Sequence, residues 1–298
     1  MKKKSVSLIC SQPKTHSVQR FLTEAKKAKL SMNLIDIKNC LITDNFDCDS
    51  EVVIHRSTAL NFDDLDLAVL RQFELMGAKS YNSSTSLELT RNKERQIIEL
   101  KNRDYNPPPS LFLRGKIDEP HTLENLEKEL DLWQKKKFSK TSDQFVLKTV
   151  RGNKGIGVSL INGRESLFSV LETFWAMGDQ RFILQPFLAH EVEYRLFYQR
   201  GKEPIIIAKK SHDGFKANAN RAKTTLLNAK SLKQKNDLIT FAEKIAEDFQ
   251  LTYAGFDFWQ LNDGRVIVGE VNPMPGFENI EELTKRNIAR ELLELFVN

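Results

Sequence analysis

The stretch GEVNPMPGFE, residues 269–278, follows the apolar run RVIVG and carries an acid and an amide two positions apart. Successive side chains of a strand point to opposite faces, so Glu270 and Asn272 lie on one face and Val271 lies on the other. Two oxygen-bearing side chains therefore converge on one spot at the end of a strand whose preceding residues are apolar.

A hairpin joins this strand to the preceding run AGFDFWQL through the residues NDGR. Asp-Gly favours a two-residue type I′ loop, here Asp263 and Gly264. Counting outward from that loop places Asp257 directly opposite Glu270 on the same face, although a loop one residue longer would break this register. Facing carboxylates repel each other, so a cation is expected between them.

Asp257, Glu270 and Asn272 are the candidate metal ligands, because hard oxygen donors of this kind suit magnesium. The alternative is that both acids lie on the solvent face of the sheet and bind nothing. An opposed pair with an asparagine in phase favours the metal site.

A second signal is FVLKTVRGNKGIGVSLI, in which Lys148 ends a strand and Gly152, Gly155 and Gly157 precede the next strand. Glycines let backbone N–H groups approach phosphate oxygens, and a lysine supplies positive charge. No helix follows and GK[ST] is absent, so this is not a Walker loop. By itself the pattern fits a tight turn equally well.

A third signal is a basic set downstream of EYRLF, where the charge of a triphosphate would need neutralising. Its members are Arg195, Lys209, Lys210, Lys216 and Arg221. Alone, the set would be an exposed basic loop. Together, the glycine loop, the lysines and the paired magnesium ligands predict a nucleoside triphosphate site.

Composition sets the broad class of the protein. The chain has 298 residues, 40% hydrophobic and 29% charged, which is typical of a globular protein with two or three packed units. A net charge of +5 without a basic stripe does not favour a nucleic-acid partner. No run approaches the roughly 20 apolar residues of a membrane helix, and MKKKSVSLIC lacks a signal-peptide cleavage site, so we expect a cytoplasmic protein. Cys10, Cys40 and Cys48 have no metal or redox spacing.

Strands and helices alternate over the first eighty or so residues. The pattern predicts strands at SVSLIC, MNLIDI and VVIHR and helices at SVQRFLTEAKKAK and LDLAVLRQFELMG, the latter closed by Gly77. Such alternation indicates a small, mostly parallel α/β sheet. The residues NSSTS are expected to separate this unit from the next helix, RNKERQIIELKNR, with a domain boundary near Ser83.

From Phe145 onward the pattern changes to α+β with antiparallel hairpins. We expect three domains: an N-terminal α/β domain over 1–83, a central domain with the glycine loop over 84–185, and a C-terminal domain with the metal site over 186–298.

The order of these motifs resembles that of the ATP-grasp carboxylate-amine ligases, and within them the RimK-like branch. The resemblance rests on AVLRQFELMGAKSYN, TRNKERQIIEL, LKTVRGNKGIGV, QPFL, EYRLF, FKANANR, AGFDF and GEVNPMPGFENIE. It implies the ATP-grasp fold, with a pre-ATP-grasp α/β domain and a nucleotide bound between two antiparallel-sheet subdomains.

The resemblance also implies roles for individual residues. Lys148 and Lys93 would bind the nucleotide phosphates, and Glu193 would lie near the ribose. The hinge that meets adenine would comprise Gln185, Pro186, Phe187 and Leu188. The triphosphate loop and the reacting groups would include Lys216, Asn218, Arg221 and Arg195, and the metal ligands would again be Asp257, Glu270 and Asn272.

The sequence departs from the family pattern at several of these positions. Pro186 stands where a glutamate is common, Glu193 replaces aspartate, and Lys216 replaces arginine. NRAK stands where the family usually continues RGG, which bears on the acceptor substrate more than on the reaction.

The implied activity is ATP- and magnesium-dependent joining of a carboxylate to an amine through an acyl-phosphate, with manganese as an alternative metal. By analogy, glutamate would be added to a peptide or protein C-terminus, and an oligomer is compatible with the family. The alternatives are a glutathione-synthetase-like ligase of small molecules, a phosphotransferase, and a non-catalytic nucleic-acid module.

Overall fold

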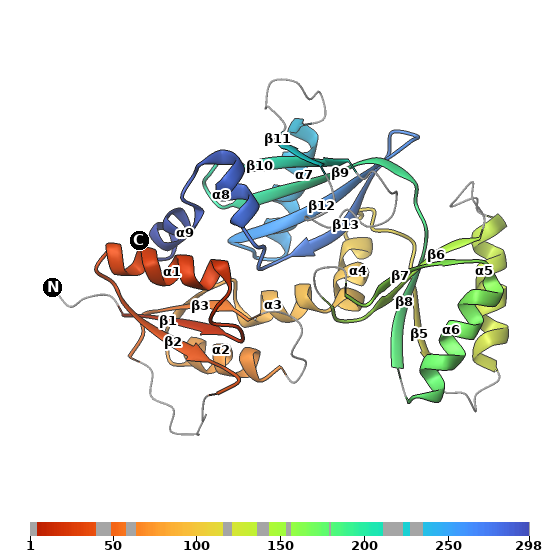
Figure 1. Cartoon of the computed structure of the whole chain (residues 1–298), viewed down its shortest axis with the longest axis horizontal. Coiled ribbons are helices and arrows are strands. Elements are labelled where there is room, and N and C mark those ends of the chain that lie inside the picture. Colours follow the sequence, from red (N-terminus) through yellow and green to blue (C-terminus); the bar gives the residue numbers. More distant parts are fainter. Residues whose placement is uncertain are drawn as a thin grey trace.

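The computed structural model describes residues 5–39, 49–57, 64–115, 121–135, 143–152, 156–178, 180–210, 223–226 and 235–297. The strands within these ranges form three sheets, which we name the N-terminal, central and C-terminal sheets (Figure 1). The expected change from a parallel α/β unit to antiparallel sheets is confirmed.

The N-terminal sheet is parallel and has a helix on each face. Its strands, in the order β2-β1-β3-β4, are β1 Ser5–Cys10, β2 Ser31–Asp36, β3 Val52–Arg56 and β4 Lys79–Tyr81, and its helices are α1 His16–Lys27 and α2 Leu65–Leu75. Phe21 of α1 packs with Leu8 on one face, and Leu70 of α2 packs with Ile9 on the other. Gly77 follows α2 with φ of +92°, as its predicted capping position requires.

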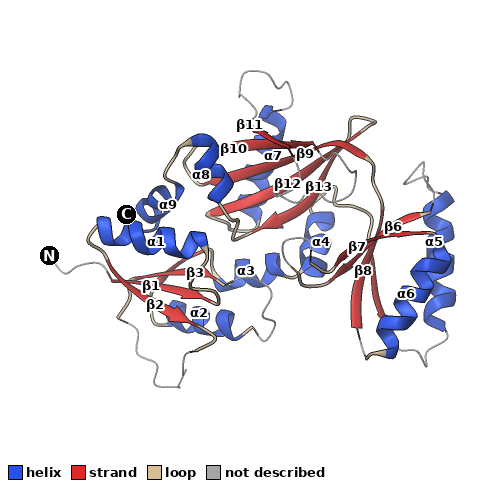
Figure 2. Cartoon of the chain, in the orientation of Figure 1, coloured by secondary structure: helices blue, strands red, loops and turns tan. Residues whose placement is uncertain are grey.

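The central sheet is antiparallel and is covered on one face by two helices (Figure 2). Its strands, in the order β5-β8-β6-β7, are β5 Leu111–Gly115, β6 Gln144–Thr149, β7 Val158–Asn162 and β8 Gln180–Pro186, and its helices are α5 His121–Lys135 and α6 Arg164–Ala176. Leu147, Leu171 and Phe182 belong to the core between sheet and helices. Lys148, one position along β6, therefore points to the opposite face, away from α5 and α6.

The C-terminal sheet has five strands, in the order β11-β10-β9-β12-β13. These are β9 His190–Gln199, β10 Ile205–Lys210, β11 Lys223–Leu226, β12 Tyr253–Leu261 and β13 Val266–Asn272, and α7 Lys235–Asp248 covers one face. Antiparallel hairpins, expected in this part of the chain, are formed by β9 with β10 and by β12 with β13.

The predicted serine-rich separator is wrong, because a helix begins inside it. Helix α3 Ser84–Arg91 starts within NSSTS, and α4 Lys93–Asn102 follows almost at once. Oγ of Ser83 accepts a hydrogen bond from the N–H of Ser86, so Ser83 is the N-cap. Serine is a poor residue in a helix interior but a good one at its start, which explains the misinterpretation.

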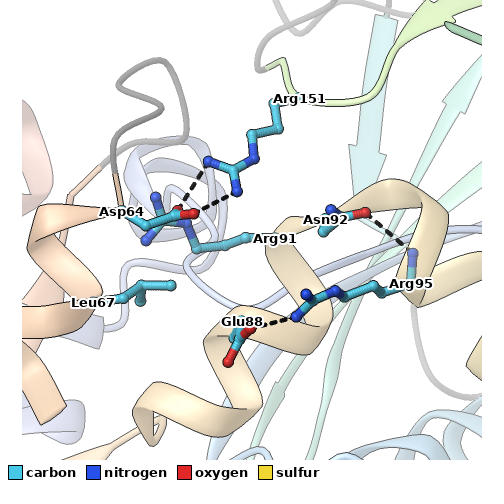
Figure 3. Close-up of a pocket in the computed structure, with 7 residues that line it drawn as sticks. All are labelled: Asp64, Leu67, Glu88, Arg91, Asn92, Arg95 and Arg151. Atoms are coloured by element: carbon cyan, nitrogen blue, oxygen red, sulfur yellow. Dashed lines mark hydrogen bonds and ion pairs between the residues drawn. The ribbon is translucent and has the colours of Figure 1, made fainter. Parts of the chain in front are cut away.

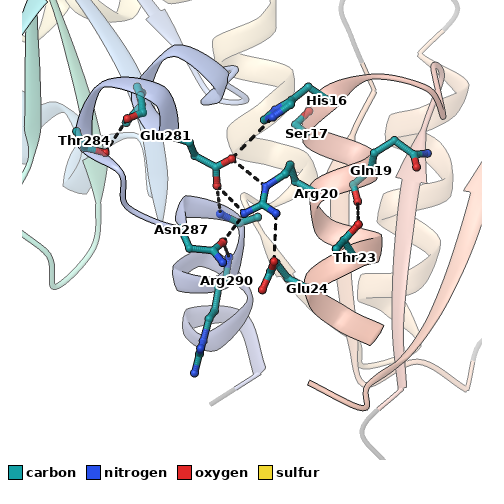
Figure 4. A network of polar contacts seen from close by, with 12 residues as sticks. His16, Ser17, Gln19, Arg20, Thr23, Glu24, Glu281, Thr284, Asn287 and Arg290 are labelled. Carbon is teal, nitrogen blue, oxygen red and sulfur yellow. Dashed lines mark hydrogen bonds and ion pairs between the residues drawn. The ribbon is translucent and has the colours of Figure 1, made fainter. Parts of the chain in front are cut away.

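The C-terminal helices return to the N-terminal sheet, where α8 Glu278–Thr284 and α9 Ile288–Val297 lie against α1 (Figure 4). The guanidinium of Arg20 donates to Glu281 at 2.9 Å and to Asn287 at 2.7 Å. Phe296 is buried in the same core as Phe21. The two ends of the chain therefore share one core, and we keep the three-domain division at Ser83 and Gln185 as a proposal. No described helix combines the length and apolar character needed to cross a membrane.

Candidate active site

The hairpin β12–β13 pairs the predicted acids as expected, but its loop and its register differ from the prediction. Asp257 and Glu270 are direct cross-strand partners, as predicted. The predicted two-residue loop is wrong: the N–H of Leu261 donates to the carbonyl of Arg265 at 2.9 Å, which leaves a three-residue loop, with φ of +87° at Gly264. This is the hairpin type in which a left-handed glycine closes a longer turn.

A bulge at Gly269 compensates for the longer loop. The register shifts by one residue between Asp257 and Phe258, because Phe258 pairs with Val268 and Gly269 is left over. A Cβ at Gly269 would lie 2.6 Å from Cε2 of Trp259, so this bulged position has room only for glycine. The extra loop residue and the bulge cancel, and the facing pair of acids is preserved.

The cation expected between the acids is supplied in part by Arg195. This residue of β9 pairs with Asp257 of β12 across the ladder. Its Nε and Nη2 donate to the two carboxylate oxygens of Asp257 at 2.7 and 2.6 Å. Asp257 raises the pKa of Arg195 above its usual range despite burial, with Glu193 and Glu270 acting in the same direction. Arg195 therefore stays charged beside the predicted metal ligands.

Lys148 reaches this charged face from the central sheet. Its ammonium lies 5.3 Å from the centroid of the Trp259 ring on β12. Burial is the largest cause that lowers the pKa of Lys148, to about 8; Lys93 acts in the same direction, and Glu270 and Glu193 act against it. The central and C-terminal sheets thus bring lysines and carboxylates into one electrostatic cluster.

Lys93 is fixed against the start of the glycine-rich loop. Its Nζ donates to the carbonyl of Gly152 at 3.1 Å, and its N–H donates to the carbonyl of Val150 at 3.4 Å. Across the loop, the N–H of Thr149 donates to the carbonyl of Gly157, which has φ of +74°. The two predicted phosphate lysines, Lys93 and Lys148, therefore flank the same loop.

Two buried amides hold the strands that carry the acids. The side chain of Gln96 on α4 accepts from the N–H of Val271 at 2.9 Å and donates to its carbonyl at 2.7 Å. Asn82 donates to the carbonyls of Tyr253 and Pro273 and accepts from the N–H of Thr252. Because β13 is the edge of its sheet, Gln96 satisfies backbone groups that would otherwise need a further strand.

The predicted hinge lies where β8 leaves the central sheet. Gln185 is buried and donates to Oγ of Ser110 at 2.8 Å, and Pro186 ends the strand. The N–H of Phe187 donates to the carbonyl of Gln144, so this N–H is already hydrogen-bonded within the protein. Leu188 is buried beside Trp259, and the adenine role of these residues stays a prediction.

Several predicted residues cannot be placed. Gly155, Lys216, Asn218 and Arg221 lie outside the described residues. The backbone of Lys209 pairs with Glu193, but its side chain is not described.

The three predicted metal ligands form a set of oxygen donors that fits a hard divalent cation. Arg195 occupies one hydrogen-bonding position on each Asp257 oxygen, and Oδ1 of Asn272 accepts from the N–H of Met274 at 2.9 Å. A carboxylate has about four lone-pair sites, so the two hydrogen bonds from Arg195 do not by themselves prevent Asp257 from coordinating a metal. Among the described residues, no three His, Cys, Asp or Glu side chains gather to hold a metal, so Asn272 would have to complete the set.

Sequence reasoning missed the residues that assemble this site. Gln96 and Asn82 reach it from segments far away in the chain, and nothing local marks them. Trp259 had a usable signal, because it is in phase with Asp257 on β12 and so lies on the charged face. Its ring also stacks on the imidazole of His190, with centroids 5.4 Å apart.

Comparisons with known proteins identify the family of the chain. The model of the RimK-like ATP-grasp domain matches residues 108–296. The "Probable alpha-L-glutamate ligase 1" of Shewanella denitrificans is 26% identical over 304 residues, covering 97% of this chain and 96% of that protein.

Solved structures show the same fold. D-alanyl-alanine synthetase A from Vibrio cholerae matches with a TM-score of 0.72 at 16% identity, over 100% of this chain and 98% of that one. The ATP-grasp ligase PsnB, complexed with a minimal precursor, matches with a TM-score of 0.69 at 16% identity, over 99% of both chains. The chain therefore belongs to the RimK-like ATP-grasp family and is an ATP-grasp ligase.

Proposed function

We propose that the protein uses ATP and magnesium to join glutamate, through its amine, to the C-terminal carboxylate of a peptide or protein. The observation that carries the proposal is the opposed arrangement of charges between two antiparallel sheets. Lys93 and Lys148 flank the glycine-rich loop, and Arg195, Asp257 and Glu270 occupy the facing strands. A triphosphate needs cations around it and oxygen ligands for its metal.

In this reaction the protein acts mainly by positioning the substrates and by supplying positive charge. The acceptor carboxylate takes the terminal phosphoryl group of ATP, and the amine then displaces phosphate from the acyl-phosphate. Lys93, Lys148 and Arg195 are the described cations that would stabilise the negative charge on the transferred group. The glycine-rich loop would exclude water, which would otherwise hydrolyse the intermediate.

Magnesium fits the same proposal. Asp257, Glu270 and Asn272 would hold it, and Arg195 would keep Asp257 oriented through its two hydrogen bonds. When bound, the metal would supply positive charge to the phosphate oxygens.

The choice of substrates rests on relatives rather than on geometry. Glutamate is suggested by the name of the Shewanella denitrificans protein, which aligns over nearly the whole chain. A peptide acceptor is suggested by PsnB, whose structure includes a precursor.

The test is a substrate-dependence assay with the purified protein, ATP and magnesium. We expect phosphate release to require both glutamate and a peptide, and mass spectrometry to show glutamyl residues added to the peptide. The Lys148→Met variant should release little phosphate under the same conditions.

Two results would contradict the proposal in different ways. Phosphate release with glutamate in the absence of a peptide would indicate a small-molecule ligase instead. Transfer of phosphate to a stable product, with no amide formed, would exclude the amide-forming reaction.

A further inference from the structure

A small open pocket lies beside the candidate active site, where three parts of the chain meet (Figure 3). The start of α2, the junction of α3 with α4, and the glycine-rich loop each contribute side chains. The lining residues are Asp64, Leu67, Glu88, Arg91, Asn92, Arg95 and Arg151. Six of these seven side chains are polar or charged, so a ligand here would be held by charge-assisted contacts rather than by apolar burial.

The charges in the lining are mixed, with an excess of one positive charge. Three arginines face two acids, so the formal sum is three minus two, or +1. Both Nη atoms of Arg151 donate to the carboxylate of Asp64, at 2.9 and 2.5 Å, and Arg95 pairs with Glu88. The lining thus pairs its guanidinium groups with its own carboxylates, and an ion with both kinds of charge could exchange with these pairs.

Arg91 is the fixed member of the set. Its side chain is only 6% exposed, and Nη1 donates to Oδ2 of Asp66 at 2.9 Å. Asp66 is also bonded to the buried His55, so Arg91 is held from behind by a buried network. Arg95 is by contrast 55% exposed and can change partner at little cost.

The pocket adjoins the residues that flank the phosphate loop. Asn92 caps α4 and lines the pocket, and the next residue, Lys93, contacts Val150 and Gly152. Arg151 lies between those two contacts. A molecule in the pocket would therefore lie next to the proposed site of phosphoryl transfer.

We propose that this pocket binds the free acidic amino acid that the ligase consumes, an inference that rests on the proposed function. Arg95 and Arg151 hold its two carboxylates, with Arg91 behind them, and Asp64 or Glu88 takes its ammonium group. Glutamate carries two negative charges and one positive charge, a net −1 that complements the lining. Glutamine lacks one carboxylate, and a glutamate residue within a peptide chain lacks the ammonium group.

The experiment is calorimetric titration of the full chain in magnesium and a non-hydrolysable ATP analogue. The probes are glutamate, glutamine and N-acetylglutamate. We expect glutamate to bind at least about tenfold more tightly than either analogue, since each lacks one charge-assisted contact. Equal binding of N-acetylglutamate would overturn the assignment to a free amino acid, and equal binding of glutamine would overturn the dicarboxylate assignment.

Two variants test the residues themselves. Arg95→Gln and Arg151→Gln should each weaken glutamate binding about tenfold, with affinity for the ATP analogue and the melting temperature kept. Arg103→Gln is the matched control for Arg95→Gln. It removes an exposed guanidinium just beyond the end of α4, the helix that carries Arg95, and this guanidinium lies outside the pocket. Unchanged glutamate affinity in both pocket variants would overturn the proposal.

The readouts keep this proposal separate from the proposed function. If the wild-type protein forms the amide and both pocket variants keep its affinity for glutamate, the pocket assignment is wrong and the function stands. If glutamate binds as expected but no amide forms with any peptide, the pocket is supported and the reaction assignment fails.

Discussion

The two faces of the C-terminal sheet are built from alternate residues of the same strands, yet they have opposite character. The face under α7 carries Leu196, Phe256 and Phe258, all fully buried. The other face is apolar where it meets the core of the N-terminal sheet, but beside the candidate site it carries Arg195 and Asp257, one position away along the same strands.

The difference shows that one sheet both stabilises the fold and carries the candidate site, with different residues for each. Apolar burial of large side chains contributes about 1.5 to 3 kcal/mol each, and this comes from the α7 face. Buried charges contribute little net stability even when they are paired, so the pair formed by Arg195 and Asp257 adds little to the fold. We therefore expect substitutions on one face to change turnover and those on the other to change unfolding.

The largest effect is expected on the charged face, from Glu270→Gln. The substitution keeps the shape of the side chain but removes a charge from the site of the predicted metal. Turnover should fall about 10² to 10³-fold. The free energy of unfolding should change by less than about 0.5 kcal/mol. Amide formation and urea unfolding, measured on the same preparation, check both; a large loss of stability with normal turnover would reverse the comparison.

Phe258→Ala should show the opposite result. The side chain is fully buried under α7, so its truncation should lower the free energy of unfolding by about 3 to 5 kcal/mol. The folded fraction should keep its affinity for ATP. Phe112→Ala is the control, since that side chain is 41% exposed and should cost much less in thermal unfolding.

Gln96→Leu tests the link between the stability of the fold and the activity of the site. It removes both hydrogen bonds to the backbone of Val271, which lies between Glu270 and Asn272. We expect a loss of about 2 kcal/mol in the free energy of unfolding, because buried backbone groups lose their partners. We also expect weaker dependence of turnover on magnesium. Gln144→Leu, which loses an exposed contact to Asn162, should change neither quantity.

The smallest effect is expected at the turn, from Gly264→Ala. The positive φ of +87° disfavours any side chain, and the cost should be about 1 kcal/mol. Turnover should be unchanged, because the substitution keeps the length of the loop and so the register of the acids. Thermal unfolding and a turnover assay check this, and a large loss of activity would mean that the turn itself controls the site.

Prediction from sequence succeeded where the structure depends on neighbours in the chain. The strand carrying Asp257 and the strand carrying Glu270 were both predicted, and so was their pairing. The prediction succeeded through two compensating errors, however, because neither the three-residue loop nor the bulge was expected. Propensity also misread NSSTS, since a serine that caps a helix looks like a serine in a loop.

The sequence by itself determined which side chains share a face, because alternation along a strand is a local property of the backbone. Together with the predicted hairpin, that was enough to place Asp257, Glu270 and Asn272 on one face, and the order of the motifs carried the resemblance to the ligase family. Only the tertiary structure decided what surrounds them. The Gln96 contact spans 175 positions and the Arg195 contact spans 62. Such contacts depend on surfaces that become neighbours only when the sheets and helices pack, so no local pattern in the chain encodes them.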